Sequence, residues 1–199
     1  MRSASNRLTF METALPRKGV LSNAVLVVGF SLATALFSQF SIWIGPVPVT
    51  GQTFAVLLAG AMLGSRLGAL SQLTYLAIGA TGVPFWFALG GPPGVARIAG
   101  PTGGYLIGFV AAAFVVGWLA ERGWDRRIWT AGAAMVIGSA AIYVFGLAWL
   151  TRFVAGDAVL KVGLYPFIAG DIIKIVLAAM ALPAGWRLLR HFKSTISLR

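Results

Sequence analysis

The sequence predicts an all-α integral membrane protein, a compact bundle of six transmembrane helices with both termini in the cytoplasm. Two observations indicate a membrane protein. Hydrophobic residues make up 58% of the 199 residues and charged residues only 11%, and the mean hydropathy is +0.86. Soluble domains carry about 25% charged residues. The third observation, the distribution of basic residues, gives the number of spans and their orientation.

Four apolar runs are long enough to cross a bilayer, which takes about 20 residues. They cover residues 20–44, 101–120, 128–151 and 166–186. A further apolar stretch, 51–81, is interrupted at Gly64-Ser65-Arg66-Leu67-Gly68. It is either one long tilted span or two short helices joined at Arg66.

The basic residues favour two short helices, because cytoplasmic segments carry an excess of Lys and Arg. With a cytoplasmic N-terminus and a helical hairpin at 51–81, three basic residues lie outside: Arg97, Arg152 and Lys161. Twelve lie inside: Arg2, Arg7, Arg17, Lys18, Arg66, Arg122, Arg126, Arg127, Arg187, Arg190, Lys193 and Arg199. A single crossing at 51–81 would move the basic group 122–127 and the C-terminal tail outside, so six spans are predicted.

The chain divides into three parts on this model. Residues 1–19 form a basic cytoplasmic segment, 20–187 the six-helix domain, and 188–199 a basic cytoplasmic tail. The basic start followed by an apolar run is similar to a signal peptide, but the run that ends at Ile44 is too long for one. A retained span in the cytoplasmic (inner) membrane is therefore expected, with translation starting at Met1 or Met11.

Several function classes are disfavoured by composition. The net charge of +11 is explained by membrane orientation, and no aromatic-plus-basic motif indicates a nucleic-acid partner. The chain has no cysteine, one histidine and five acidic residues, and no acidic pair within a span is spaced for metal or acid–base catalysis. A Walker A motif is absent from the sequence, so no ATP hydrolysis, metal or cofactor is expected.

The best candidate site is the pair Asp171 and Lys174, two charges inside the apolar run 166–186. A charge at that depth costs at least about 2.5–3.5 kcal/mol and normally faces a partner or a cavity. Spacing i, i+3 places both on one helical face. A ligand site is favoured over an ion pair that only packs, because buried ion pairs seldom stabilise on net.

Three irregular segments fall on the outer side in this orientation: 44–53, 80–104 and 152–165. Irregular backbone at membrane depth must be buried in protein or line a cavity. The segments therefore predict an outward-facing pocket. Within the second, the aromatic run Phe85, Trp86 and Phe87 is a candidate lid or an interfacial belt.

Other polar residues in these segments are weaker candidates. Arg97 is either a carboxylate-binding group or a headgroup anchor. The run 100–105 places Thr102 and Tyr105 at a helix start, where its glycines permit close approach of a ligand or of another helix. Gln52 and Thr53 open the second helix, where their polar groups either cap that helix or reach the pocket. Capping is favoured, more so for Thr53, and Gln52 is a candidate binding residue.

Small residues four apart in the first span form a candidate docking surface for another helix. The two pairs are Gly29 with Ala33 and Ser31 with Ala35.

Taken in order and spacing, these motifs resemble the BioY family, the biotin-binding S components of energy-coupling factor (ECF) transporters. The resemblance covers about residues 24–185. It rests on Pro46-Val-Pro-Val-Thr with Gln52-Thr53, Leu57-Leu-Ala-Gly-Ala-Met-Leu-Gly64, Gly100-Pro-Thr-Gly-Gly-Tyr105, and Pro166-Phe with Gly170-Asp-Ile-Ile-Lys174.

The resemblance implies a six-helix S component that captures biotin at the outer face and carries it across the membrane. Asp171 would accept hydrogen bonds from the ureido N–H groups, and Lys174 would donate to the ureido oxygen. The turn 100–105 would border the pocket, with Thr102 and Tyr105 as polar contacts, and Arg97 would meet the carboxylate. Partners would be membrane lipid, a transmembrane coupling subunit and two ATP-binding subunits. Some family members work without those subunits. The first span departs from the family pattern, which has alanines four apart at the docking surface.

Three alternatives stay open: an S component for thiamine or riboflavin, a proton-coupled secondary transporter that uses Asp171 as its relay, and a membrane scaffold in which the charges are structural.

Overall fold

The computed structural model describes residues 8–14 and 19–196, and most of them are helical. The described elements are, in chain order, α1 (Phe10–Ala14), α2 (Val20–Ser38), β1 (Ser41–Trp43), β2 (Pro48–Thr50), α3 (Gln52–Leu63), α4 (Ser65–Ala80), α5 (Val95–Ala99), α6 (Gly103–Ala120), the 3-10 helix η2 (Trp124–Arg126), α7 (Ile128–Leu150), α8 (Val159–Gly163) and α9 (Tyr165–Ile196).

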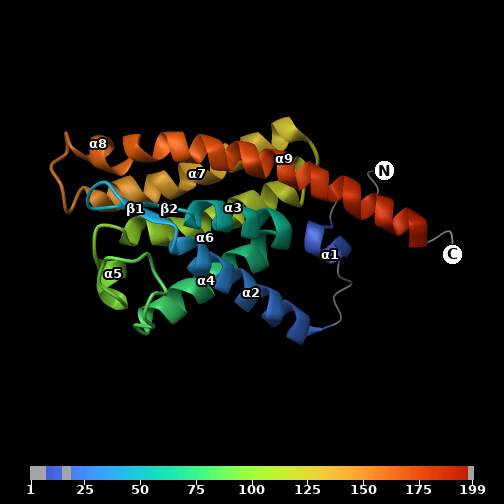
Figure 1. The fold of residues 1–199 in the computed structure, drawn as a ribbon, viewed down its shortest axis with the longest axis horizontal. Coiled ribbons are helices and arrows are strands. Elements are labelled where there is room, and N and C mark those ends of the chain that lie inside the picture. Colours follow the sequence, from blue (N-terminus) through green and yellow to red (C-terminus); the bar gives the residue numbers. More distant parts are fainter. Residues whose placement is uncertain (1–7, 15–18, 197–199) are drawn as a thin grey trace.

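Within the described ranges, four segments are long and apolar enough to cross a membrane: Val20–Ser38, Gly103–Ala120, Ile128–Leu150 and Val159–His191. They correspond to the four runs predicted from the sequence. Helix α6 lies at the centre, packed against α3, α4 and α7 (Figure 1). Small residues allow this close packing. A Cβ on Gly104 would lie 2.2 Å from the Cβ of Trp149 on α7.

The stretch 51–81 folds as two helices, as predicted, but the break lies at Gly64 and not at Arg66. Gly64 has φ +86°, a conformation that L side chains rarely adopt. Ser65 starts α4, and Arg66 lies in its first turn. The Glu121 carboxylate fixes the start of α4, since its Oε1 accepts from the Ser65 backbone N–H at 2.7 Å and from the Ser65 hydroxyl at 2.8 Å.

The first apolar run does not stay helical to residue 44. Helix α2 ends at Ser38, and β1 pairs antiparallel with β2, with Ile42 opposite Val49. Pro46 and Pro48 explain the change, because proline cannot donate a helical hydrogen bond and disfavours the α conformation of the residue before it. The sequence identified this segment as irregular but did not predict the β-hairpin.

The three segments predicted as irregular gather at one end of the molecule. The hairpin of β1 and β2, the loop with α5, and the loop with α8 all lie at the left of Figure 1. A hydrogen bond from the Trp43 indole N–H to the Leu89 carbonyl, at 2.6 Å, joins the hairpin to the loop with α5.

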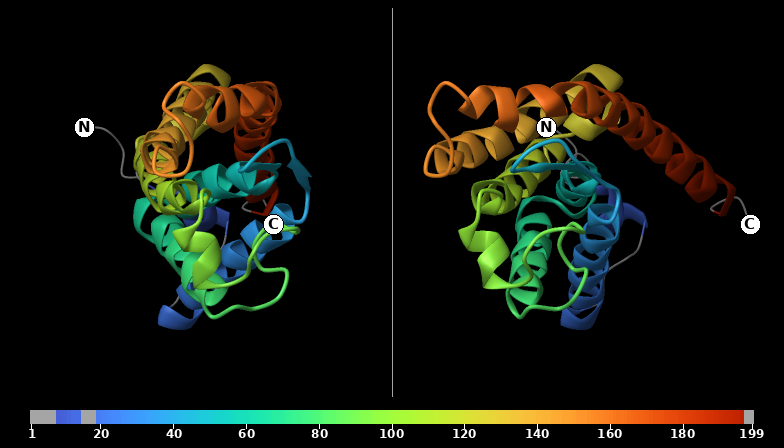
Figure 2. Two further views of the ribbon diagram at one scale, coloured as in Figure 1. Left: turned by 90° about the vertical axis from the view of Figure 1, so that its left-hand side faces the viewer. Right: turned by 60° about the vertical axis from the view of Figure 1, so that its left-hand side comes forward.

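The opposite end holds α1 and the last turns of α9 (Figures 1 and 2), and η2 packs against α9. Trp186 joins them: its indole N–H donates to the Asp125 Oδ2 at 2.5 Å, and its ring meets Phe10 edge-on at 5.4 Å. Helix α1 is held by a capping box, in which the Thr9 backbone N–H donates to the Glu12 Oε2 at 2.9 Å and the Glu12 N–H donates back to the Thr9 Oγ1 at 3.4 Å.

Helix α9 continues without a break from residue 165 to 196, past residue 187, where the sequence places the boundary between the membrane domain and the tail. Five basic residues counted as cytoplasmic, Arg2, Arg7, Arg17, Lys18 and Arg199, lie outside the described residues. Met1, one candidate start, also lies outside them.

Candidate functional site

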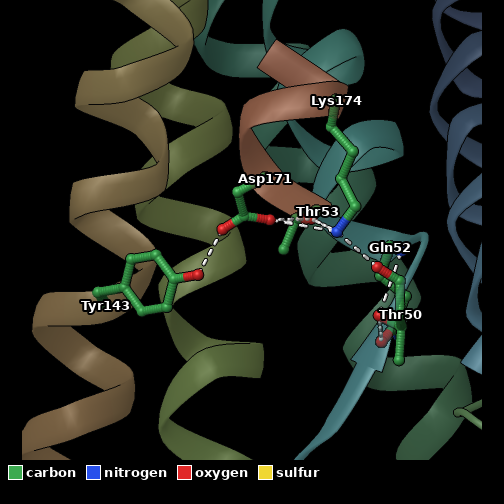
Figure 3. A network of polar contacts seen from close by, with 6 residues as sticks. All are labelled: Thr50, Gln52, Thr53, Tyr143, Asp171 and Lys174. Atoms are coloured by element: carbon green, nitrogen blue, oxygen red, sulfur yellow. Dashed lines mark hydrogen bonds and ion pairs between the residues drawn. The ribbon is translucent and has the colours of Figure 1, made fainter. Parts of the chain in front are cut away.

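Asp171 and Lys174 lie on one face of α9 and form an ion pair. The Lys174 Nζ is 3.2 Å from the Asp171 Oδ1. The side chains of Lys174 and Asp171 are 16% and 9% exposed. Figure 3 shows both directed toward residues of β2, α3 and α7. The spacing in the sequence therefore correctly predicted that the two charges share one side of the helix.

The Lys174 ammonium uses all three of its donor positions inside the protein. It donates to the Thr50 carbonyl oxygen and the Thr53 Oγ1, both at 2.8 Å, in addition to Asp171. A buried charge is costly unless it is paired and hydrogen-bonded. These three acceptors provide that compensation and hold the side chain in place.

The Asp171 carboxylate accepts from three groups. Its Oδ2 accepts from the Tyr143 hydroxyl, and its Oδ1 accepts from Lys174 and, at 3.5 Å, from the Thr53 hydroxyl. A carboxylate offers about four acceptor positions. One position on Oδ2 therefore remains available to a further donor.

Thr53 and Gln52 do not cap α3, contrary to the expectation from their position. The N-cap of α3 is Gly51, which has no side chain, and the first backbone N–H of the helix, that of Gln52, donates to the Thr50 hydroxyl at 3.2 Å. The Thr53 hydroxyl instead bridges Lys174 and Asp171. The Gln52 side chain accepts from the Thr50 hydroxyl at 2.9 Å and donates to the Tyr75 hydroxyl at 2.5 Å. Charged groups on α9, distant in sequence, compete successfully for the hydroxyl of Thr53.

A pocket with an empty volume of about 600 Å³, open mouth included, lies beside these groups. It is lined by Val47, Pro48, Thr50, Gln52, Thr53, Phe87, Ala88, Arg97, Thr102, Tyr105, Leu106, Phe109, Ser139, Ile142, Tyr143, Phe167 and Lys174. Of the three segments predicted as irregular, 44–53 and 80–104 contribute lining residues to the pocket, and 152–165 does not. Asp171 is not among the lining residues, but Lys174 and Tyr143, which both donate to its carboxylate, line the pocket.

Arg97 lines the same pocket and is 4% exposed. Its guanidinium donates to the Ala88 carbonyl and lies 5.3 Å from the centre of the Trp43 ring. Burial lowers the pKa of Arg97. Within the described ranges no carboxylate pairs with it. The site therefore holds a second buried cation whose partners differ from those of Lys174.

Thr102 and Tyr105 both line the pocket but are engaged with the protein. The Thr102 hydroxyl donates to the Arg97 carbonyl at 3.2 Å, and the Tyr105 hydroxyl donates to the Gly163 carbonyl at 2.8 Å. The neighbouring Gly104 serves helix packing, because its face is covered by Trp149. Tyr105 also forms part of an aromatic wall, stacked on Phe167 at 6.3 Å.

The three aromatic residues proposed as a lid have three different environments. Phe85 is 72% exposed and adopts φ +58°. Trp86 is half-buried and stacks on Tyr75 at 5.9 Å. Phe87 is 5% exposed and lines the pocket. Its ring occupies the space left by Gly79, where a Cβ would lie 2.2 Å from the Phe87 Cζ.

The two small-residue pairs of α2 face different directions. Ser31 and Ala35 are buried inside the protein, against the bundle. Gly29 is exposed and has open space around its Cα, and Ala33 is half-buried. The pair Gly29 and Ala33 is therefore the one accessible to another helix.

The model of the BioY family matches residues 6–191. The chain belongs to the BioY family. It is 42% identical over 155 residues to a probable biotin transporter BioY of Pyrococcus horikoshii, covering 78% of this chain and 90% of the relative. It is 39% identical over 176 residues to the biotin transporter BioY of Rhizobium etli, covering 82% and 92%.

The fold of this BioY-family protein is also similar to a solved structure. A crystal structure of the S component for biotin from an ECF-type ABC transporter superposes with a TM-score of 0.70 at 24% identity, covering 82% of this chain and 90% of the other. Together with its apolar helices, the match identifies a helical, multi-pass membrane protein.

Sequence reasoning missed the contribution of α7 and the start of α9. Ser139, Tyr143 and Phe167 line the pocket of this BioY-family protein. A usable signal existed, because Ser139 and Tyr143 are four residues apart in an apolar span and thus share a face. In the described parts of the chain no group of three His, Cys, Asp or Glu side chains gathers as a metal site.

Proposed function

We propose that this protein captures biotin in the pocket and takes it up across the cytoplasmic membrane as the substrate-specificity subunit of an ECF-type transporter. The observation that carries the proposal is a pocket with two cations, the partly buried Lys174 and the buried Arg97, that have separate partners. Biotin has a ureido ring at one end and a carboxylate at the other, and thus two groups for two cations. Family membership and relatives named as biotin transporters support it, and the subunit itself is not an enzyme.

The ureido ring would lie against Lys174 and Asp171. Lys174 donates to the ureido oxygen after exchanging its contact with Thr50 or Thr53, since all its donors are occupied without ligand. Asp171 accepts a ring N–H at the free position of Oδ2. The order of the cluster favours binding, because pre-organised groups lose little freedom when the ligand arrives.

The carboxylate would pair with Arg97. The guanidinium offers five N–H donors, and its hydrogen bond to the Ala88 carbonyl leaves donors for a bidentate contact. A buried cation without an acidic partner gains most from an anionic ligand. The apolar carbon and sulfur atoms between the two ends would contact the aromatic wall of Tyr105, Phe167 and Phe87, which is typical of small-molecule pockets. Thr102 and Gln52 also line the pocket and would add polar contacts to the ligand.

We propose six spans with both termini in the cytoplasm, with 1–19 as the basic N-terminal segment, 20–187 as the membrane domain and 188–199 as the tail. Helices α3 and α4, of 12 and 16 residues, would be about 18 and 24 Å long. Each is shorter than a hydrocarbon core of about 30 Å. Two observations support their pairing as a helical hairpin that supplies two of the six spans: the sharp turn at Gly64, and the packing of both helices on α6.

Transport would require a transmembrane coupling subunit and two ATP-binding subunits, with membrane lipid around the bundle. Gly29 and Ala33 on α2 offer a close-contact surface for the coupling subunit, whereas Ser31 and Ala35 are already covered. Small side chains let two helix backbones approach closely.

Calorimetric titration of the purified protein in nanodiscs tests the substrate. Biotin should bind with a stoichiometry of one, and thiamine and riboflavin should not bind. Binding of thiamine or riboflavin in place of biotin would reassign the substrate. Absence of any binding by a folded sample would reject a role in vitamin capture.

A further inference from the structure

Tyr75 lies at the centre of a chain of hydrogen bonds that joins the loop 82–94 to Lys174. It is on α4, is fully buried and does not line the pocket. Its hydroxyl meets two polar groups, the Trp86 carbonyl of the loop and the Gln52 side chain of α3. A hydroxyl in such a position can donate to one group while it accepts from the other.

On the loop side, Tyr75 contacts two adjacent residues. Its hydroxyl donates to the Trp86 carbonyl at 3.3 Å, and the Trp86 indole N–H donates back to the Tyr75 carbonyl at 2.8 Å. The rings of Tyr75 and Trp86 stack, and Phe87 meets Tyr75 edge-on at 5.4 Å. Phe87 and Ala88, the next residues, form part of the pocket wall. Tyr75 thus holds the part of the loop that covers the pocket.

On the pocket side, the contacts lead to the ammonium group. Gln52 donates to the Tyr75 hydroxyl at 2.5 Å and accepts from the Thr50 hydroxyl at 2.9 Å. The Thr50 carbonyl accepts from Lys174 at 2.8 Å. Thr50, Gln52 and Tyr75 are all buried, so water does not compete for these bonds.

We propose that Tyr75 is a positioning residue that couples closure of the loop 82–94 over the pocket to the placement of Lys174. This inference rests on the proposed function for its ligand. When a ligand oxygen takes the Lys174 donor that Thr50 holds, Thr50 and Gln52 can shift from their unliganded positions. The hydrogen bond from Gln52 to the Tyr75 hydroxyl then changes, and with it the bond from Tyr75 to the Trp86 carbonyl of the loop. By linkage, closure of the loop raises affinity by the same factor as the ligand favours closure.

The phenol ring alone does not account for this arrangement, because packing requires no hydroxyl. Tyr75→Phe keeps the ring and removes two hydrogen bonds. Tyr165→Phe is the matched control, since Tyr165 is largely exposed at the start of α9 and does not line the pocket.

The experiment combines the biotin dissociation rate with hydrogen–deuterium exchange of the segment 82–94, with and without biotin. Tyr75→Phe should release biotin about tenfold faster, the effect of losing a buried hydrogen bond. The slowing of exchange in 82–94 by biotin should fall by a similar factor. The loop 152–158 should exchange equally in all variants, and Tyr165→Phe should behave as the parent protein.

Unchanged dissociation and unchanged protection in Tyr75→Phe, even with a lower Tm, would overturn the inference and leave Tyr75 a packing residue. If the parent protein binds no biotin, the proposed function fails instead. The role of Tyr75 is then tested by hydrogen–deuterium exchange without ligand. Tyr75→Phe should still speed the exchange of 82–94 about tenfold, because the loop loses its hydrogen bond to the Tyr75 hydroxyl. Gln52→Met interrupts the same chain from α3 and should reproduce both effects if Tyr75→Phe does not fold.

Discussion

Replacement of Arg97 by glutamine separates two roles that its position allows. The guanidinium lines the pocket and also donates to the Ala88 carbonyl, so it either binds the ligand carboxylate or only holds the loop. Glutamine keeps a hydrogen-bond donor but removes the charge. A hydrogen bond to a charged group contributes about 1.5–3 kcal/mol. Arg97→Gln should therefore raise the Kd for biotin about 10- to 150-fold.

The assay is a cycle of four titrations by calorimetry, with the parent protein and Arg97→Gln each measured against biotin and biotinol. Biotinol carries an alcohol in place of the carboxylate and keeps the ureido ring. The parent protein should bind biotinol more weakly than biotin by the same factor that Arg97→Gln loses for biotin. Arg97→Gln should bind the two ligands about equally. Arg152→Gln is the control, because Arg152 is exposed and its guanidinium lies 4.3 Å from the Trp149 ring.

Equal losses for biotin and biotinol in Arg97→Gln would refute the carboxylate contact. In that case the cost would come from the loop, through the lost hydrogen bond to Ala88. Additive effects in the cycle mean no direct interaction, whereas a coupling energy of a kcal/mol or more indicates contact.

Three further changes test other parts of the model. Asp171→Asn should keep the fold and weaken biotin binding by about 1.5–3 kcal/mol in calorimetry, because a charged acceptor is lost; an unchanged Kd would reject Asp171 as a ligand group. The chain has no natural cysteine, so Arg66→Cys should resist an impermeant maleimide in intact cells while Gly156→Cys reacts, and external labelling of position 66 would contradict the hairpin. Burial raises the pKa of Asp125 to about 6 from 3.8, against the opposing hydrogen bond from Trp186. The folded protein then retains a proton that the unfolded chain has lost, so stability falls as pH rises from about 4 to about 6; Asp125→Asn should flatten Tm over that range and raise it at pH 7, and a lower Tm at pH 7 would contradict this account.

The sequence predicted the elements that depend on local composition. The apolar runs 101–120 and 128–151 became α6 and α7 almost without change, because length and hydropathy suffice to define a buried membrane helix. The spacing of Asp171 and Lys174 predicted their common face, because residues three apart in a helix lie on the same side. The β-hairpin at 41–50 was missed because its stability depends on cross-strand pairing and on the turn around Pro46, which apolar content does not reveal.

The pocket could be predicted only in part, because its wall joins residues that are far apart in the chain. Thr53 was expected to cap its own helix and instead bonds to two residues more than 100 positions away. Tyr143 was not considered, since a tyrosine in an apolar span is ordinary unless the position of Asp171 beside it is known. Tertiary contacts decided both cases, and local patterns cannot rank such contacts.

Helix α9 is longer than a membrane is thick. Its 32 residues extend about 48 Å, compared with a hydrocarbon core of about 30 Å. Lys174 and Arg190 are thus about 24 Å apart along one helix, which contains Pro183 between them. A tilt of about 10° around Lys174 would displace Arg190 by about 4 Å at that separation. A ligand that tilts α9 at the pocket would therefore also move the other end of this helix, where α1 and η2 pack on Trp186.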